Sequence, residues 1–252
     1  MSYHEIPASK NLSHIIDTYW FFSQVAAPTT HRIFPDACAD LIINLGDKTN
    51  KIPASEIALS GIMTQFSDTH FPSNTKLLGI RFKAGQLGQL TQIPMQETKN
   101  KTLLASDIFP TFSTNFLEQI ATKKKLSTQL DFLEHKLSRL IHSTQQEQDL
   151  PVLAVVNTLQ TSTNLSLQLV AKRHCISLRQ LERRFKNKVG ISMKSFQRVS
   201  RFKKVFKVIQ SQPQKSISEI AYQNGYYDHA HLAKECYTFT GKYPSQLRSI
   251  KN

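Results

Sequence analysis

The last hundred residues of the chain carry apolar side chains at helical spacing. Val152, Val155, Val156 and Leu159 recur every three or four positions, which predicts an amphipathic helix. After it, the same spacing occurs twice: Leu167, Val170 and Ala171 follow Ser166, and Ile217, Ile220 and Ala221 follow Ser216. Serine is a common N-cap, and Ser216 with Glu219 also matches the S-x-x-E capping-box pattern. We therefore expect two short helices of similar structure.

A second helix is predicted after each of these short helices. It begins at a capping residue and has an apolar residue four positions later, as in Ser177 with Leu181 and Asp228 with Leu232. Ser177 and Asp228 are 51 positions apart, and the same offset pairs Phe185 with Cys236, Gly190 with Gly241 and Phe196 with Leu247. An internal duplication explains this correspondence.

The spacing between the paired helices predicts two helix-turn-helix units. Such a unit needs a small residue where its second helix crosses the first, and Ala171 and Ala221 stand there. Four positions later it needs a residue that tolerates a positive φ, and Cys175 and Gly225 stand there. Glycine suits that conformation and cysteine does not, so we expect the first turn either to be strained or to adopt another geometry.

The first half of the chain has a different pattern. Short β-like runs at 41–45, 57–59 and 77–82 are separated by turn residues. An amphipathic helix is predicted near 127–142, with Ser127 as its N-cap. A run of polar residues at 143–149 follows, and then Pro151 stands where a helix can start. We expect two domains: a β-rich α+β domain over 1–145 and an all-α domain over 150–252.

Charge divides at the same place. Residues 150–252 hold 18 Lys and Arg against four acidic residues, whereas residues 1–149 hold 14 of each, so the excess of +14 lies in the second half. A basic domain of this kind indicates a polyanionic partner, for which nucleic acid and an anionic membrane surface are the two candidates.

Other chemistry is poorly supported. The three cysteines, Cys38, Cys175 and Cys236, are far apart, which suits neither a disulfide framework nor a zinc site. The segment His31–Gly46 gathers polar residues beside a strand, but without a metal-ligand spacing, so we expect a structural turn. The aromatic run at 19–22 is interpreted as core rather than as a ligand pocket. We expect no catalytic residue, metal or cofactor, no membrane segment, and a soluble cytoplasmic protein.

The second half resembles the DNA-binding domain of the AraC/XylS family of bacterial regulators. The resemblance is carried by Ile217-Ser-Glu-Ile-Ala221, Gly225-Tyr-Tyr-Asp228, Gly241-Lys-Tyr-Pro244-Ser-Gln-Leu-Arg248, and Ser177-Leu-Arg-Gln-Leu-Glu-Arg-Arg-Phe185 with Gly190. In the first half, the segment 31–46 with Leu59-Ser-Gly-Ile-Met-Thr64 and Leu78-Gly-Ile-Arg-Phe82 resembles an uncharacterised domain often fused to such regulators. The resemblance implies a tandem helix-turn-helix domain joined to a sensing or dimerising domain, in related proteins often a cupin-like barrel followed by helices.

The resemblance also implies which residues meet DNA. A long helix over Met193–Gln210, roughly 27 Å by its rise per residue, would hold the two units against successive major grooves. The predicted DNA-binding residues are Arg179, Glu182, Arg183 and Lys186 in the first unit, Arg201 in the long helix, and His229, Ala230, Ala233 and Lys234 in the second unit. Among these we expect Arg183 to read a guanine, because arginine binds guanine bidentately. For Lys203, Lys204 and Lys207 we expect solvation or phosphate contact.

These patterns predict a transcription regulator that binds specific sequences of double-stranded DNA, and not an enzyme. The expected partners besides DNA are RNA polymerase, a small-molecule effector and a second copy of the chain. Two alternatives stay open. One is a DNA-alkyl-repair methyltransferase with the same DNA-binding module. The repair domain of such enzymes resembles a four-cysteine zinc site, whereas Cys38 is the single cysteine of the first half here. The other is an architectural DNA-binding protein without an effector.

Overall fold

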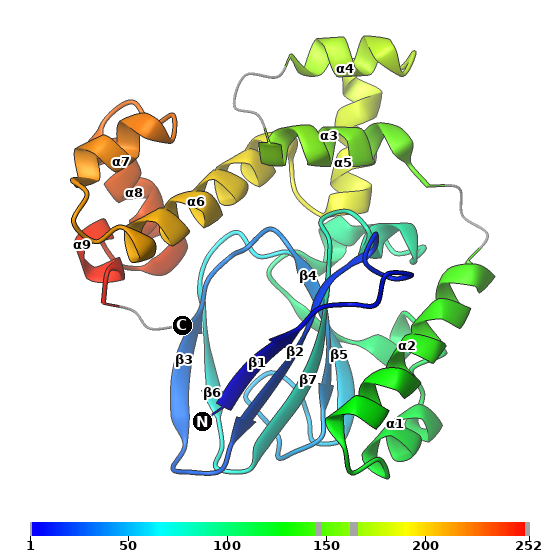
Figure 1. Cartoon of the computed structure of the whole chain (residues 1–252). Helices are drawn as coiled ribbons and strands as arrows, with labels where there is room; N and C mark the ends of the chain where they lie inside the picture. The colour runs from blue at the N-terminus through cyan, green and yellow to red at the C-terminus, as the bar shows by residue number, and fades with distance from the viewer. Residues whose placement is uncertain (1, 145–147, 162–165, 250–252) are drawn as a thin grey trace.

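A β-rich part is followed along the chain by a helical part (Figure 1). The computed structural model describes residues 2–144, 148–161 and 166–249. The predicted linker falls partly on residues 145–147, which lie outside the described residues. The β-rich and helical fold classes predicted for the two halves are confirmed.

Two antiparallel sheets form the β-rich part. The larger has the strand order β1-β2-β7-β4-β5-β8 and the smaller pairs β3 with β6. Their bounds are β1 Ser2–Ile6, β2 Ile16–Gln24, β3 Thr29–Ile33, β4 Ala39–Asn44, β5 Glu56–Ser60, β6 Ser67–Phe71, β7 Thr75–Phe82 and β8 Thr102–Leu104. The small sheet stands beside the large one as a separate ribbon (Figure 1). This arrangement is an open six-stranded sheet with a separate two-stranded sheet beside it.

The aromatic run of β2 belongs to the core, as predicted. Trp20 and Phe22 are buried together with Phe71 of the small sheet, and the rings of Phe22 and Phe71 lie 4.6 Å apart. The indole of Trp20 covers Gly79 of the neighbouring strand, where a Cβ would overlap the ring, so only glycine fits there. Tyr19 faces the other core, formed between the large sheet and the helices that follow it.

Helices complete the N-terminal half. The short 3-10 helices are η1 Leu87–Gln89, η2 Met95–Thr98 and η3 Ala105–Asp107, and the α-helices are α1 Thr114–Ala121 and α2 Leu126–Ser143. The prediction that Ser127 caps the second helix is wrong, because the helix starts at Leu126 with Lys125 at the N-cap position. Leu126 packs against the sheet core, so the helix starts two residues earlier than a cap at Ser127 would place it.

The C-terminal half is entirely helical in its described residues. Its helices are α3 Leu150–Thr161, α4 Leu167–Arg173, α5 Leu178–Val189, α6 Met193–Ser211, α7 Ile217–Gln223, α8 His229–Thr240 and α9 Pro244–Leu247. Helices α4 and α5 form the first predicted helix-turn-helix unit, and α7 and α8 form the second. Helix α6 connects the units, packing Phe196 against Phe185 of α5 and Phe202 against Phe239 of α8.

The predicted caps are present. Ser166, Ser177, Ser216 and Asp228 each accept a hydrogen bond from a backbone N–H in the first turn of the following helix. A reciprocal capping box forms between Ser177 and Gln180. Of the capping box predicted at Ser216, only the hydrogen bond from the Glu219 N–H to the serine side chain forms. The Glu219 carboxylate lies instead beside Lys215 Nζ, at 3.8 Å.

The turns of the two units have the same geometry. Cys175 has φ 52° and Gly225 has φ 72°, both in the left-handed region. In each turn the backbone N–H of the next residue donates a hydrogen bond to the carbonyl oxygen of the alanine in the first helix. These bonds run from Ile176 to Ala171 at 3.1 Å and from Tyr226 to Ala221 at 3.0 Å. The first turn therefore keeps the common geometry and carries strain at Cys175.

We expect Cys175→Gly to stabilise the protein by about 1 kcal/mol, because glycine adopts a positive φ without steric cost. The free energy of unfolding, measured by chemical denaturation, checks this. Gly225→Ala is the matched control and should lower the same quantity. Equal stabilities for Cys175→Gly and the parent chain would show that the first turn is unstrained.

Candidate nucleic-acid interface

Helix α5 presents its predicted reading residues on one side. Leu181, Phe185 and Val189 are buried in the helical core, whereas the four predicted residues are exposed. These four are Arg179, Glu182, Arg183 and Lys186. All of them line one open groove of about 1090 Å³, together with Lys194 at the start of α6. The sequence prediction for this helix thus corresponds to one continuous, predominantly cationic surface.

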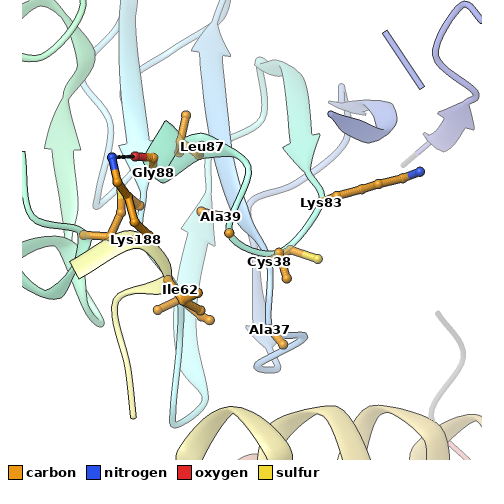
Figure 2. A pocket seen from close by; sticks show the side chains of 12 residues that line it. Ala37, Cys38, Ala39, Ile62, Lys83, Leu87, Gly88 and Lys188 are labelled. Atoms are coloured by element: carbon orange, nitrogen blue, oxygen red, sulfur yellow. Dashed lines mark hydrogen bonds between the residues drawn. The ribbon is translucent and has the colours of Figure 1, made fainter. Parts of the chain in front are cut away.

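The other side of α5 contacts Asp149 and the N-terminal half. Arg184 makes a bidentate ion pair with Asp149, with Nε 2.8 Å from Oδ2 and Nη2 2.9 Å from Oδ1. The backbone N–H of Asp149 donates to Gln89 Oε1 at 3.0 Å. Farther along α5, Lys188 Nζ donates to the carbonyl oxygen of Gly88 at 2.9 Å (Figure 2). Helix α5 is therefore attached to the β-rich domain through η1.

Two glycines allow this close packing. A Cβ on Gly88 would overlap the backbone of Lys188. A Cβ on Gly190, which ends α5 with φ 99°, would lie 2.9 Å from both Met95 O and Ile62 Cγ2. The hollow left between the two halves here holds only about 10 Å³, the space of one water molecule (Figure 2). The contact is thus closed in this conformation.

Helix α8, the predicted reading helix of the second unit, has a less polar outward surface. His229, Ala230 and Lys234 are exposed and Ala233 is half-buried, while Leu232 is fully buried. Positions 229, 230, 233 and 234 share one side of a helix by their spacing. Lys234 and His229 are the polar groups among these four predicted positions, so this surface offers fewer charged contacts than that of α5.

Arg201 is engaged inside the second unit. Its Nη2 lies 3.2 Å from Glu235 Oε2, its Nη1 donates to Gly225 O at 3.1 Å, and its guanidinium lies 4.1 Å from the ring centre of Tyr226. Glu235 is buried and also pairs with Arg198 at 2.6 Å. The structure therefore connects Arg201 to the turn and to α8, apart from the outward residues of that helix.

The lysines of α6 do not form one group. Lys204 and Lys207 are exposed, as expected, but Lys203 points into the contact with the N-terminal half, with Nζ 3.9 Å from Cys38 Sγ. Burial by itself would lower the pKa of Lys203, but Cys38, Asp36 and Asp17 nearby outweigh it and raise that pKa. The expectation of solvation or phosphate contact is wrong for Lys203, because acidic and thiol groups of the β-rich domain surround it.

The second unit also touches the β-rich domain. Arg32 of β3 donates from Nη1 to Thr240 O at 3.3 Å, and Asp68 and the ring of Phe66 hold its guanidinium. Gly241, with φ 67°, lies directly over this arginine. Together with Phe34, whose ring meets Phe206 of α6 at 5.4 Å, these contacts bring both units and their connecting helix against one domain.

Sequence reasoning missed this contact surface. Gln89 and Arg184 lie 60 and 35 positions from their common partner Asp149, and these contacts follow no local period. The one local signal is Gly190: a glycine just after a predicted helix favours a C-cap, but it does not predict the contact with η2.

The fold and its exposed basic surface define a class of protein: a tandem helix-turn-helix DNA-binding module joined to a β-rich domain. Residues 170–250 match the family described as Helix-turn-helix domain, and residues 4–104 match the family described as Domain of unknown function (DUF6597). The resemblance predicted from the motifs is confirmed: the chain carries an AraC-type helix-turn-helix domain in its C-terminal half. No curated protein matches the sequence.

Solved structures of similar fold include ToxT from Vibrio cholerae O395 bound to (E)-4-(8-methylnaphthalen-1-yl)but-3-enoic acid, at 12% identity and a TM-score of 0.50, covering 90% of this chain and 97% of that one. Another structure of ToxT from Vibrio cholerae has 13% identity, full coverage of both chains and a TM-score of 0.48. The C-terminal domain of AraT, a response regulator from Geobacillus stearothermophilus, is 25% identical, covering 40% of this chain and 85% of that one, at a TM-score of 0.36.

Among the described helices, none is both long enough and apolar enough to cross a membrane.

We expect Arg184→Ala to lower the free energy of unfolding by about 2 kcal/mol, because it leaves the largely buried Asp149 carboxylate without its cation. Arg183→Ala is the matched control, since it removes the same side chain from an exposed position one residue away. Chemical denaturation of the full chain measures both. Equal losses in the two variants would contradict the structural role of Arg184.

Proposed function

We propose that this protein regulates transcription by binding a specific DNA sequence with α5 and α8 in successive major grooves. The observation that carries the proposal is the division of α5: an inner side fixed to the protein by Arg184 and Lys188, and an outer side with Arg179, Arg183 and Lys186 exposed together. A reading helix must expose its base-contacting side chains while its backbone is held in place. Helix α6, with 19 residues, is about 28 Å long, close to the helical repeat of B-DNA, roughly 34 Å.

Within this proposal the nine predicted residues have different roles. Arg183 contacts guanine, and Arg179, Glu182 and Lys186 contact the neighbouring bases or phosphates. On α8, Ala230 and Ala233 approach thymine methyl groups, with His229 and Lys234 beside them. Arg201 acts on DNA binding indirectly by holding α8 through Glu235, so its loss should lower thermal stability as well as affinity.

We further propose that residues 1–145 are the regulatory domain and residues 150–252 the DNA-binding domain. The β-rich part contacts α5, α6 and the end of α8, so a ligand that shifts it would change the placement of both reading helices. RNA polymerase, a second copy of the chain and a small-molecule effector complete the proposed set of partners, and the cytoplasm is where such a regulator meets DNA. ToxT, of similar fold, has been solved with a bound aryl butenoic acid.

Selection of bound sites from random double-stranded DNA tests the proposal with the full chain. We expect one enriched sequence with two half-sites about one helical turn apart. Repeating the selection with small molecules from cell extract separates an effector-responsive regulator from an architectural protein, whose affinity would not change. Absence of any enriched sequence would contradict the proposed function.

We expect Arg183→Ala to weaken binding to the selected site by about 1–3 kcal/mol and to relax preference at one base position, because a bidentate guanine contact is lost. Lys204→Ala should weaken binding to all sequences alike and reduce the salt slope by about one unit. Titrations against single-base variants of the site measure both effects. Unchanged base preference in Arg183→Ala would contradict its assigned role.

A further inference from the structure

The N-terminal half reaches the groove in front of α5. Gln96, in the short helix η2, lines this groove with Arg183 and Lys186, although it lies about ninety positions away in sequence. Its side chain is exposed, while its neighbours Met95 and Thr98 are buried. A residue of the β-rich domain thus faces the same space as the predicted DNA-reading residues.

The position of Gln96 relative to α5 is fixed by backbone packing. Met95 O lies so close to Gly190 that only glycine fits at the end of α5. Thr98 Oγ1 donates to the same Met95 O at 2.8 Å, which braces η2 from within. The distance between Gln96 and the reading helix therefore does not depend on a flexible side-chain contact.

The chemistry of the groove favours a phosphate backbone. Its lining contains the cations Arg179, Arg183, Lys186 and Lys194 against the single acid Glu182. Double-stranded DNA with a major groove on α5 brings its sugar-phosphate strands along both sides of that helix. An exposed amide N–H₂ is a common donor to phosphate oxygen.

We propose that Gln96 contacts the DNA backbone beside the half-site read by α5, so that the β-rich domain itself forms part of the DNA-binding surface. This proposal rests on the proposed function, because it requires α5 to occupy a major groove. It goes beyond the helix-turn-helix units by adding a contact from the other domain. The contact would also couple any shift of the β-rich domain directly to DNA affinity.

Charge changes at Gln96 in the full chain test the proposal. We expect Gln96→Glu to weaken binding to the selected site about fivefold at low salt, since a carboxylate would stand close to a phosphate. Gln96→Lys should tighten binding and make the log–log salt slope steeper by about 0.9, the value for one additional neutralised phosphate. A gain of affinity cannot result from misfolding.

The matched controls are Asn115→Glu and Asn115→Lys, which make the same charge changes at an exposed amide on α1, away from α5 (Figure 1). Both should leave affinity nearly unchanged. If the Gln96 and Asn115 pairs give equal affinities while the parent chain binds its site, the Gln96 contact is wrong and the proposed function stands. If the parent chain binds no specific site, the proposed function fails and the contact with it.

Discussion

The arrangement of the molecule depends on Asp149, the residue that begins the helical half. Its carboxylate caps α3 by accepting from Val152 N at 3.2 Å and pairs bidentately with Arg184 of α5, while its own N–H donates to Gln89. A single residue therefore joins the β-rich domain, the first helix of the second half and α5. Because the side chain is largely buried, charge-assisted hydrogen bonds to it are stronger than those at the surface.

This attachment explains how α5 serves two purposes. Adjacent arginines have opposite roles, since Arg184 is turned to the protein and Arg183 to the groove. The second unit is attached less firmly, through Arg32 and Thr240 O at 3.3 Å, with a partly exposed guanidinium. In the proposed regulation, a shift of the β-rich domain would move the second unit more readily than the first. In the proposed complex, the first unit would supply most of the charged contacts to DNA and the second would adjust the fit.

Local patterns predicted the helix-turn-helix units well, because caps, turns and apolar spacing are properties of neighbouring residues. The pairs Ser166 and Ser216, and Cys175 and Gly225, occupy equivalent positions in the structure as they do in the sequence. The contact between the two halves could not be predicted in this way. Lys203 belongs to the same helix as the exposed Lys204, and only tertiary packing decides that one faces Cys38 and the other solvent. The place of Gln96 beside α5 could not be predicted for the same reason, because tertiary packing alone brings η2 to that helix.

If α5 lies in a major groove, the turn that precedes it, at Cys175, lies at the edge of the DNA. Of the three cysteines, Cys38 and Cys236 are buried and Cys175, in the turn before α5, is exposed, so a thiol-reactive iron–EDTA reagent can be attached there without mutation. Mapping the DNA cleavage produced by this full-chain conjugate on its selected site measures where the turn lies. We expect cleavage clustered within a few base pairs at one edge of the half-site that contains the guanine contacted by Arg183. Cleavage spread evenly over the DNA, or confined to the other half-site, would contradict it.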